Sequence, residues 1–394
     1  MMRYDFDTII DRKGTDTIKL GCLKDLFGRE DLIPLWIADM DFETPDFIRE
    51  ALENRLKHPI YGYSLSPESY WQSIIDWQQY MHGWDISREW LTFIPGIVKG
   101  IGLTMLHFTG KGDSVIIQPP VYHPFRLVTK RNGRVVVNNQ LIWDGSRYHM
   151  DFDNLESILK RRRCPLLILS NPHNPGGCMW DRETLVTLAQ ICHKYNVTVI
   201  SDEIHADMPL FGKRHIPFTT VSQEARQVGI VFGAPSKTFN MAGLVSSYAI
   251  IPNPVLRKSF YDFLGANELN NATFMATVAT RAAYTQGKEW HRQMLHYIQD
   301  NIDYVVEQMP RLIPGIKVSR PDASFLLWLD CRELKNEGIT DIPKFFIGAG
   351  LALNDGATFG PGGEGFMRLN IGYPRAILEK ALDQLYTHYR KVIS

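Results

Sequence analysis

The chain has 394 residues and a mass of 45.2 kDa, enough for two or three domains, or for one large domain with a smaller one appended. Its 43 basic and 43 acidic residues cancel, which disfavours a polyanionic partner such as nucleic acid. No segment approaches the roughly 18 apolar residues of a membrane span, and the five cysteines form no C-x-x-C pair, so we expect a cytoplasmic protein with no membrane contact and no metal site.

The first 45 residues are predicted to form an irregular arm that lies over a larger body, because glycines and a proline interrupt them. Within the arm, residues 36–42 (WIADMDF) place the small side chain of Ala38 beside aromatic and acidic neighbours. A Thr-Pro-Asp sequence then predicts the start of an amphipathic helix over residues 45–56. Tyr61 follows in a Tyr-Gly-Tyr turn, where packing against neighbours is an alternative to any functional role.

A second helix is expected from about residue 66 to 82, and a third, apolar one over residues 97–107. The third helix follows the turn Pro95-Gly96, so Ile97 and Val98 lie in its first turn. The start of a helix presents free N–H groups and a partial positive charge, which suit a phosphate. The nearby Gly110-Lys111 is not a P-loop, because Gly112 stands where Ser or Thr is required.

Strands are predicted over residues 114–118 and 131–137. Between them, Tyr122 lies in the segment PPVYHPF, where the prolines on both sides restrict its backbone. A tyrosine held in this way could stack on a flat aromatic ligand, although a proline–aromatic turn without a ligand is the alternative.

Three further apolar runs predict buried strands that end at polar residues. Residues 166–169 are followed by the loop SNPHNPGG, which contains Asn174, and residues 197–201 by Asp202. The third run, residues 228–232, precedes Lys237. Parallel strands would bring this amide, carboxylate and amine to one edge of a sheet. A lysine buried there is partly desolvated and suited to Schiff-base chemistry, whereas Ser-x-Lys-Thr alone could equally mark an ordinary surface lysine.

From about residue 285 the pattern changes to a long helix over residues 290–309, followed by shorter strands and helices. This predicts a small α/β lobe packed against the N-terminal arm. Arg368 lies in the middle of the apolar segment FMRLNIG, where a buried guanidinium requires an anionic partner.

In this order, the motifs WIADMDF, YGY, SNPHNPGG, SDEIHAD and SKTFN resemble the aspartate aminotransferase superfamily of pyridoxal 5′-phosphate (PLP) enzymes, fold type I. Within it they resemble the cystathionine β-lyase branch, the carbon–sulfur lyases of the MalY and PatB type. The resemblance implies a large α/β domain with a mainly parallel sheet between helices, plus a smaller α/β domain. We assign residues 1–45 to an arm of the small domain, 46–284 to the large PLP-binding domain and 285–394 to the small domain.

The resemblance also implies the roles of the cofactor residues. Lys237 binds PLP covalently, and Asp202 keeps the pyridine nitrogen protonated. Glu203 and Asp207 are rival carboxylates, but the spacing in the family selects Asp202. The remaining cofactor contacts are the ring-stacking Tyr122, Asn174 at the 3′-oxygen, His205 where aminotransferases carry a tyrosine, and Ile97, Val98 and Ser236 at the phosphate. For His205, a satisfied core histidine remains an alternative.

On the substrate side, the family implies that Arg368 binds the α-carboxylate, with contacts from the backbone at Ala38 and from Tyr122 and Asn174. Tyr61 would reach the cofactor phosphate from a neighbouring subunit, which requires a homodimer. Ala234 and Val245 depart from the pattern, because many relatives carry a phosphate-binding serine and a phosphate-binding cation there. The phosphate would then be held by amides and Tyr61, or by a basic residue not yet identified.

The implied activity is elimination from L-cystathionine or other cysteine S-conjugates to a thiol, pyruvate and ammonia, with Lys237 as the general base at Cα. One alternative is an aminotransferase that uses the same residues. Another is a catalytically silent binding protein that retains PLP as structure, against which the intact Lys237, Asp202 and Arg368 argue.

Overall fold

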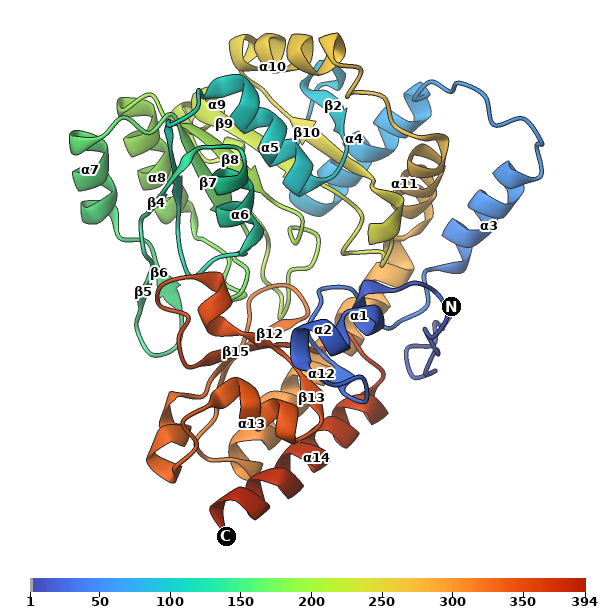
Figure 1. The fold of residues 1–394 in the computed structure, drawn as a ribbon. Helices are drawn as coiled ribbons and strands as arrows, with labels where there is room; N and C mark the ends of the chain where they lie inside the picture. The colour runs from blue at the N-terminus through green and yellow to red at the C-terminus, as the bar shows by residue number, and fades with distance from the viewer. Residues whose placement is uncertain (1–2) are drawn as a thin grey trace.

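A seven-stranded sheet forms the centre of the larger part of the protein, as the computed structural model of residues 3–394 shows (Figure 1). In spatial order its strands are β2 (Leu91–Ile94), β10 (Ser247–Ile250), β9 (Gly229–Gly233), β8 (Thr198–Asp202), β7 (Leu166–Ser170), β3 (Ser114–Ile117) and β4 (Val135–Asn138). Neighbours pair in parallel except where β10 meets β9 and β2. This confirms the mainly parallel sheet.

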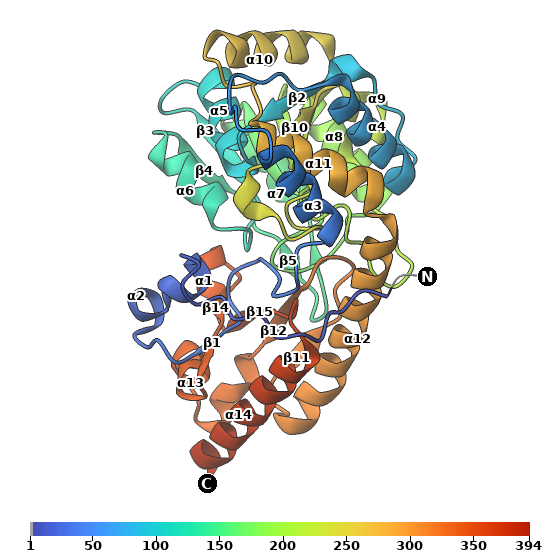
Figure 2. The same ribbon diagram turned by 90° about the vertical axis from the view of Figure 1, so that its right-hand side faces the viewer.

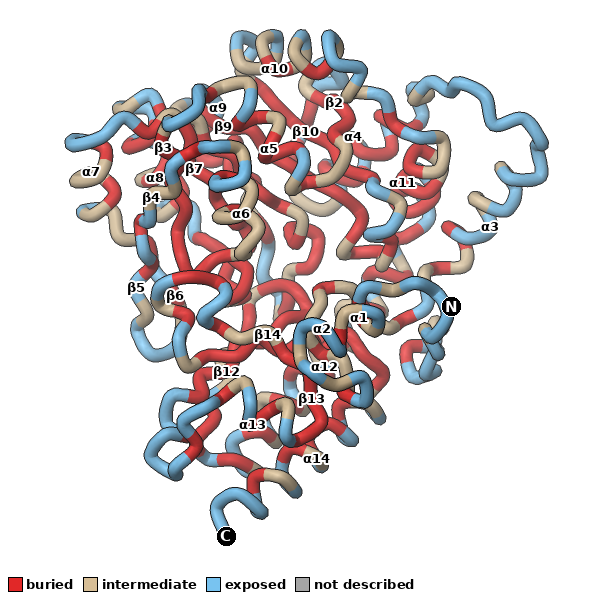
Figure 3. The backbone as a smooth tube through the Cα atoms, in the orientation of Figure 1, coloured by how far each residue is buried: buried red, intermediate tan, exposed pale blue. Residues whose placement is uncertain are grey.

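Helices cover both faces of this sheet, as the apolar character of its strands requires. One face packs on α5 (Ile97–Phe108), α6 (Pro124–Arg131) and α10 (Pro254–Ala266), and the other on α4 (Glu68–His82), α7 (Phe152–Arg161), α8 (Arg182–Lys194), α9 (Gln223–Val228) and α11 (Phe274–Gln286). Along β7, Leu166 and Ile168 join the first of these cores, while Leu167 and Leu169 join the second. The strands are accordingly buried between the helices, except for the edge strand β4, whose residues are half-buried or exposed (Figure 3).

Close packing brings α5 onto the sheet. A Cβ atom added at Gly100 would lie 2.7 Å from Ile94 Cδ1 and 3.2 Å from Phe232 Cε2, so a larger residue would require these side chains to shift. Gly96, which precedes the helix, has φ of 104°, a conformation that other residues rarely adopt. These two glycines place the beginning of α5 beside the ends of the neighbouring strands.

The smaller part is built on a four-stranded antiparallel sheet with the order β11 (Lys317–Ser319), β12 (Leu326–Asp330), β15 (Phe366–Asn370) and β14 (Asn354–Asp355). Around it lie α12 (Lys288–Leu312), α13 (Ile342–Gly348) and α14 (Arg375–Ile393). Figure 2 shows α12 descending from the larger part and running beside α14.

The N-terminal arm lies against this smaller part, as expected. Its strand β1 (Ile33–Pro34) pairs in parallel with β13 (Leu351–Ala352), and α1 (Ile18–Gly21) and α2 (Leu23–Phe27) lie on the same side of the molecule (Figure 2). The chain then crosses to α3 (Asp46–Leu56) in the larger part. The division into domains at residues 45 and 284 stays a prediction.

The remaining elements are a short hairpin, β5 (Ile142–Trp143) with β6 (Tyr148–His149), and five 3₁₀ turns. The turns are η1 (Arg88–Trp90), η2 (Phe218–Thr220), η3 (Ala242–Leu244), η4 (Arg332–Glu337) and η5 (Gly356–Phe359). Among residues 3–394, no helix has both the length and the apolar character to cross a membrane. The strand predicted over residues 131–137 was too long, because α6 continues to Arg131 and β4 begins only at Val135.

Candidate active site

Three neighbouring strands deliver the candidate residues to one edge of the large sheet. Ser170, the last residue of β7, pairs with Asp202 at the end of β8, and Asp202 pairs with Phe232 of β9. The loops that follow β7 and β9 carry Asn174 and Lys237. The expectation that amide, carboxylate and amine meet at one edge is therefore confirmed.

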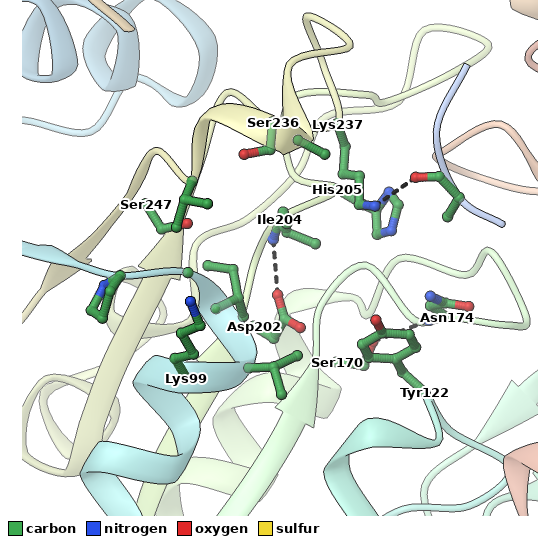
Figure 4. Close-up of a pocket in the computed structure, with 17 residues that line it drawn as sticks. Lys99, Tyr122, Ser170, Asn174, Asp202, Ile204, His205, Ser236, Lys237 and Ser247 are labelled. Atoms are coloured by element: carbon green, nitrogen blue, oxygen red, sulfur yellow. Dashed lines mark hydrogen bonds between the residues drawn. The ribbon is translucent and has the colours of Figure 1, made fainter. Parts of the chain in front are cut away.

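A cavity of about 280 Å³ opens at this edge (Figure 4). Its walls come from the arm, the start of α5 and the loops after β3, β7, β8 and β9. The lining residues are Ala38, Pro95, Gly96, Ile97, Val98, Lys99, Tyr122, Ser170, Asn174, Asp202, Ile204, His205, Ser236, Lys237, Ala242, Val245 and Ser247.

Lys237 projects its amine into the cavity, where Nζ donates a hydrogen bond to the carbonyl oxygen of Ala38 at 2.5 Å (Figure 4). Burial lowers the pKa of Lys237 to about 8, with Arg368 and Lys19 acting in the same direction and Asp39 and Asp202 opposing them. A larger share of this amine is therefore neutral near pH 7 than of an ordinary lysine, and only the neutral amine is nucleophilic.

Asp202 is buried, and no described residue forms an ion pair with it. Burial raises its pKa to about 7, although the N–H of Ile204 donates to Oδ1 at 3.1 Å and Lys237 also favours the charged form. Among the described residues, the carboxyl group therefore has no cation in direct contact, and Lys237 offsets only part of the effect of burial.

The two rival carboxylates are engaged elsewhere. Glu203 Oε2 lies 2.8 Å from Nε2 of His215, and its Oε1 accepts the N–H of Phe218. Asp207 accepts from Trp77 Nε1 at 2.9 Å and lies 3.0 Å from Nε2 of His82. Neither lines the cavity, so the geometry agrees with the choice of Asp202.

Arg368, in the middle of β15, stands behind Asn174 and does not itself line the cavity. Its Nη1 donates to Asn174 Oδ1 at 3.0 Å, while Nη2 donates to Asn354 Oδ1 at 2.6 Å and to the carbonyl oxygen of Trp36 at 2.8 Å. All three acceptors are neutral, and the buried Nε has no partner. Burial accordingly lowers the pKa of Arg368 to about 10, as expected for a cation without a counter-ion.

The bond from Arg368 also fixes the orientation of Asn174. Because Oδ1 faces a guanidinium donor, the amide NH₂ of Asn174 must point the other way and is free to donate. The backbone of the same residue accepts from the N–H of Tyr122 at 3.0 Å, which ties the two loops together.

His205 is buried and Tyr122 is half-buried, and both line the cavity. Burial raises the pKa of Tyr122 and lowers that of His205 to about 3, so both side chains are neutral at physiological pH. Nδ1 of His205 lies 3.1 Å from Oγ of Ser324. His205 is thus a satisfied core histidine that also contacts the cavity, and the two interpretations are compatible.

Ile97, Val98 and Ser236 line the cavity together with three polar residues that were not predicted from the sequence, Lys99, Ser170 and Ser247. Lys99 belongs to the first turn of α5, and Figure 4 shows its amine pointing into the cavity. The sequence signal for Lys99 is its place in the motif Pro95-Gly96-Ile97-Val98-Lys99-Gly100, two residues after the start of the helix.

Tyr61 does not reach the cavity of its own chain. The side chain is 58% exposed, its hydroxyl donates to the carbonyl oxygen of Leu56 at 3.0 Å, and its ring stacks on Phe274 with centroids 5.7 Å apart. Within the single chain Tyr61 is therefore a surface residue, as a role in a neighbouring subunit would require.

Two known proteins are similar in sequence to this chain over nearly its whole length. Cystathionine beta-lyase PatB of Bacillus subtilis is 39% identical over 384 residues, which cover 97% of this chain and 98% of PatB. Protein MalY of Escherichia coli is 32% identical over 391 residues, which cover 99% of this chain and all of MalY.

A solved structure is also similar to this chain over nearly its whole length. The crystal structure of the PLP-bound C–S lyase from Staphylococcus hominis matches with a TM-score of 0.91 and 34% identity, over 98% of both chains. The model of the family described as aminotransferase class I and II matches residues 30–385. The chain therefore belongs to the aminotransferase class I and II family.

Proposed function

We propose that this protein is a PLP-dependent carbon–sulfur β-lyase that acts on L-cystathionine or related cysteine S-conjugates. The observation that carries the proposal is the pairing, in one cavity, of a buried lysine amine with a buried carboxyl group that has no cationic partner. PatB, which aligns over 97% of the chain, is named a cystathionine beta-lyase, and the Staphylococcus hominis structure is of a PLP-bound C–S lyase.

The residues present fit PLP. The unpaired Asp202 would accept a hydrogen bond from a protonated pyridine nitrogen, which is the cation that this carboxyl group lacks. The free amide NH₂ of Asn174 would donate to the 3′-oxygen, and Tyr122 offers an aromatic face to the ring. Lys237 is the amine that would bind the aldehyde carbon.

The opposite end of the cavity fits the phosphate. In the first turn of α5, N–H groups have no partner within the helix, and Lys99, Ser236 and Ser247 add an ammonium group and two hydroxyls. Lys99 would supply the charge that other family members place at the position of Val245.

Bound PLP supplies an electron sink for the negative charge that forms at Cα of the substrate. Arg368, which contacts the cavity-lining Asn174, would bind the α-carboxylate through its unpaired Nε, and the backbone at Ala38 would close the other side. Lys237, as the free amine, would take the Cα proton. The thiolate then leaves from Cβ and is protonated, and hydrolysis of the remaining three-carbon unit gives pyruvate and ammonia.

We further propose that the enzyme is a homodimer with shared sites and resides in the cytoplasm. The segment around Tyr61 exposes Ile60, Tyr61, Tyr63 and Leu65, with exposures of 58% or more, which is typical of a surface covered by a partner. From such a position Tyr61 of one subunit could contact the phosphate in the other. All five cysteines are free thiols, which fits a reducing compartment.

The test is an assay of the PLP-loaded protein with L-cystathionine, with and without an added 2-oxo acid. Pyruvate and free thiol formed in the absence of 2-oxo acid support the lyase. New amino acid formed only with the 2-oxo acid would support an aminotransferase instead. Absence of both products would support a protein that keeps PLP only as structure.

A further inference from the structure

Asn240 joins the turn that carries Lys237 to the arm. We call residues 234–243 the lysine turn and residues 36–42 the arm loop. The Oδ1 atom of Asn240 accepts the N–H of Met40 at 3.0 Å, and its Nδ2 donates to the carbonyl oxygens of Met40 at 2.9 Å and Phe42 at 2.7 Å. The amide side chain therefore bridges the arm loop in the way that a neighbouring strand would.

The orientation of this amide is fixed by its partners. A backbone N–H must face Oδ1, and two carbonyl oxygens must face Nδ2, so a flipped amide would lose all three bonds. The hydroxyl of Thr44 also donates to the carbonyl oxygen of Asn240 at 2.9 Å. Asn240 has φ of 52°, the left-handed conformation that asparagine tolerates better than most residues.

This bridge lies beside the contact between Lys237 and Ala38. Asn240 follows Lys237 by three residues, and Met40 follows Ala38 by two, so the hydrogen bond from Nζ to Ala38 closes a small ring of contacts. A lysine acts as a base through its neutral amine. These contacts fix the position of the Nζ atom from which Lys237 would act.

The arm loop also forms ion pairs that do not involve the lysine turn. Nζ of the fully buried Lys19 lies 2.7 Å from Asp39 Oδ1 and 2.8 Å from Asp41 Oδ1, and Arg12 pairs with the same two carboxylates. Burial would raise the pKa of Asp39, but Lys19 and Arg12 outweigh it and lower that pKa. These ion pairs fix the loop to the arm, whereas Asn240 fixes it to Lys237.

We propose that Asn240 is a positioning residue that sets the location of the Lys237 amine for covalent capture of PLP and for proton removal from the substrate. The inference rests on the proposed function, because it assigns these tasks to Lys237. Displacement of a reacting group by about 1 Å can cost about a hundredfold in rate, so a single bridging amide is enough to control the chemistry.

The test compares Asn240→Gly with the matched control Asn196→Gly. Asn196 is also left-handed, with φ of 55°, but lies exposed after α8 and away from the cavity. Glycine permits the left-handed backbone at both positions, and Asn196→Gly controls for the flexibility that glycine adds, so the difference between the two variants reports the loss of the amide. Asn240→Asp keeps the size but turns a carboxylate toward the carbonyl oxygens of Met40 and Phe42.

Three quantities are measured for each variant: the rate of covalent PLP capture by the folded apoprotein, kcat and KM for elimination, and the midpoint of thermal unfolding. We expect Asn240→Gly to lower the capture rate and kcat together by roughly ten- to a hundredfold, with KM within about twofold. Asn240→Asp should be impaired at least as much, and Asn196→Gly should match the wild type.

A merely structural role would lower the unfolding midpoint and leave capture per folded molecule unchanged, and that result would overturn the inference. So would a capture rate for Asn240→Gly within about twofold of wild type. If the wild-type protein itself captures no PLP, the proposed function fails. The two failures are therefore distinguishable.

Discussion

The Nζ atom of Lys237 lies 2.5 Å from the carbonyl oxygen of Ala38, although 199 residues separate them in the chain. The contact joins the large sheet to the N-terminal arm inside a single cavity. It holds the amine among the groups that would bind the cofactor ring, and burial there lowers the pKa of Lys237 to about 8.

This pKa predicts how PLP capture depends on pH. About one Lys237 amine in ten is neutral at pH 7, against about one in three thousand for a lysine with a pKa of 10.5. Because only the neutral amine attacks the aldehyde, the capture rate of the apoprotein should rise with pH and level off above about 8.5.

Absorbance of bound PLP gives this rate, with Nα-acetyl-lysine as the reference amine. The reference reaction should keep accelerating to about pH 10, because its amine has an ordinary pKa. A protein capture rate that also continued to rise between about pH 9 and 10 would show that burial does not activate Lys237.

Replacement of the buried carboxylate should separate stability from activity. Asp202→Asn should lower kcat by about a hundredfold or more, because the partner of the pyridine nitrogen is lost. The folded-state pKa of Asp202, about 7, lies above the ordinary carboxyl value of 3.8, so ionisation destabilises the apoprotein. This cost is absent below about pH 3.8, grows as pH rises to about 7 and stays constant above that.

The Asp202→Asn apoprotein should therefore unfold at a higher temperature than wild type at pH 8, by a margin that shrinks toward pH 4. Asp207→Asn is the contrasting control, because Asp207 is held by Trp77 and His82 and its replacement should destabilise the fold. The measurement is the midpoint of thermal unfolding of both apoproteins between pH 4 and pH 8. Destabilisation by Asp202→Asn at pH 8 would contradict a cofactor role.

Much of this site could be predicted from the sequence, because its main residues directly follow buried strands. Asp202 ends β8, and the loops after β7 and β9 carry Asn174 and Lys237, so strand order alone brings them together. The carboxyl ends of neighbouring parallel strands generally lie at one edge of a sheet. Each strand can be identified from a short apolar run, so no long-range information is needed.

Other parts depended on contacts that no local pattern records. Asn240 binds Met40 of the arm loop, and Asn354 accepts a hydrogen bond from Arg368 of β15. In the sequence, both asparagines look like ordinary residues of a turn or of a strand end. The strand predicted over residues 131–137 begins too early. The run Val135 to Val137 indicates a strand, but the short, polar helix α6 gives no clear signal of where it ends. Helix α11, rich in Ala and Thr, also gives a weak helical pattern.

Lys99 provides a test of how the phosphate is held. Lys99→Gln should weaken PLP binding by about ten- to a hundredfold, the usual effect of losing a hydrogen bond to a charged group. The measurement is a fluorescence titration of the apoprotein in buffer without phosphate.

Pyridoxal, which lacks the phosphate, is the matched ligand, and its affinity should be the same for the variant and wild type. Lys111→Gln, an exposed lysine beyond the other end of α5, is the matched protein control. Equal weakening of PLP and pyridoxal by Lys99→Gln would mean that Lys99 supports the fold of the cavity and not the phosphate.

Arg368→Lys should impair binding of substrates that carry an α-carboxylate. A lysine can neither bridge Asn174 and Asn354 nor offer a planar fork to a carboxylate. We expect kcat/KM to fall by about a hundredfold, mainly through KM. The control substrate is an S-substituted cysteamine, which has no carboxylate, and its slow reaction should be equal in both proteins. An equal loss for both substrates would contradict the carboxylate clamp.

The most direct test of the account is to reduce the PLP-loaded protein with borohydride and to locate the cofactor by peptide mass analysis. We expect a single reduced adduct on the peptide that contains Lys237, and none in Lys237→Ala, which should also form no pyruvate from L-cystathionine. An adduct on Lys99 or another lysine, or pyruvate formation by Lys237→Ala at the wild-type rate, would contradict it.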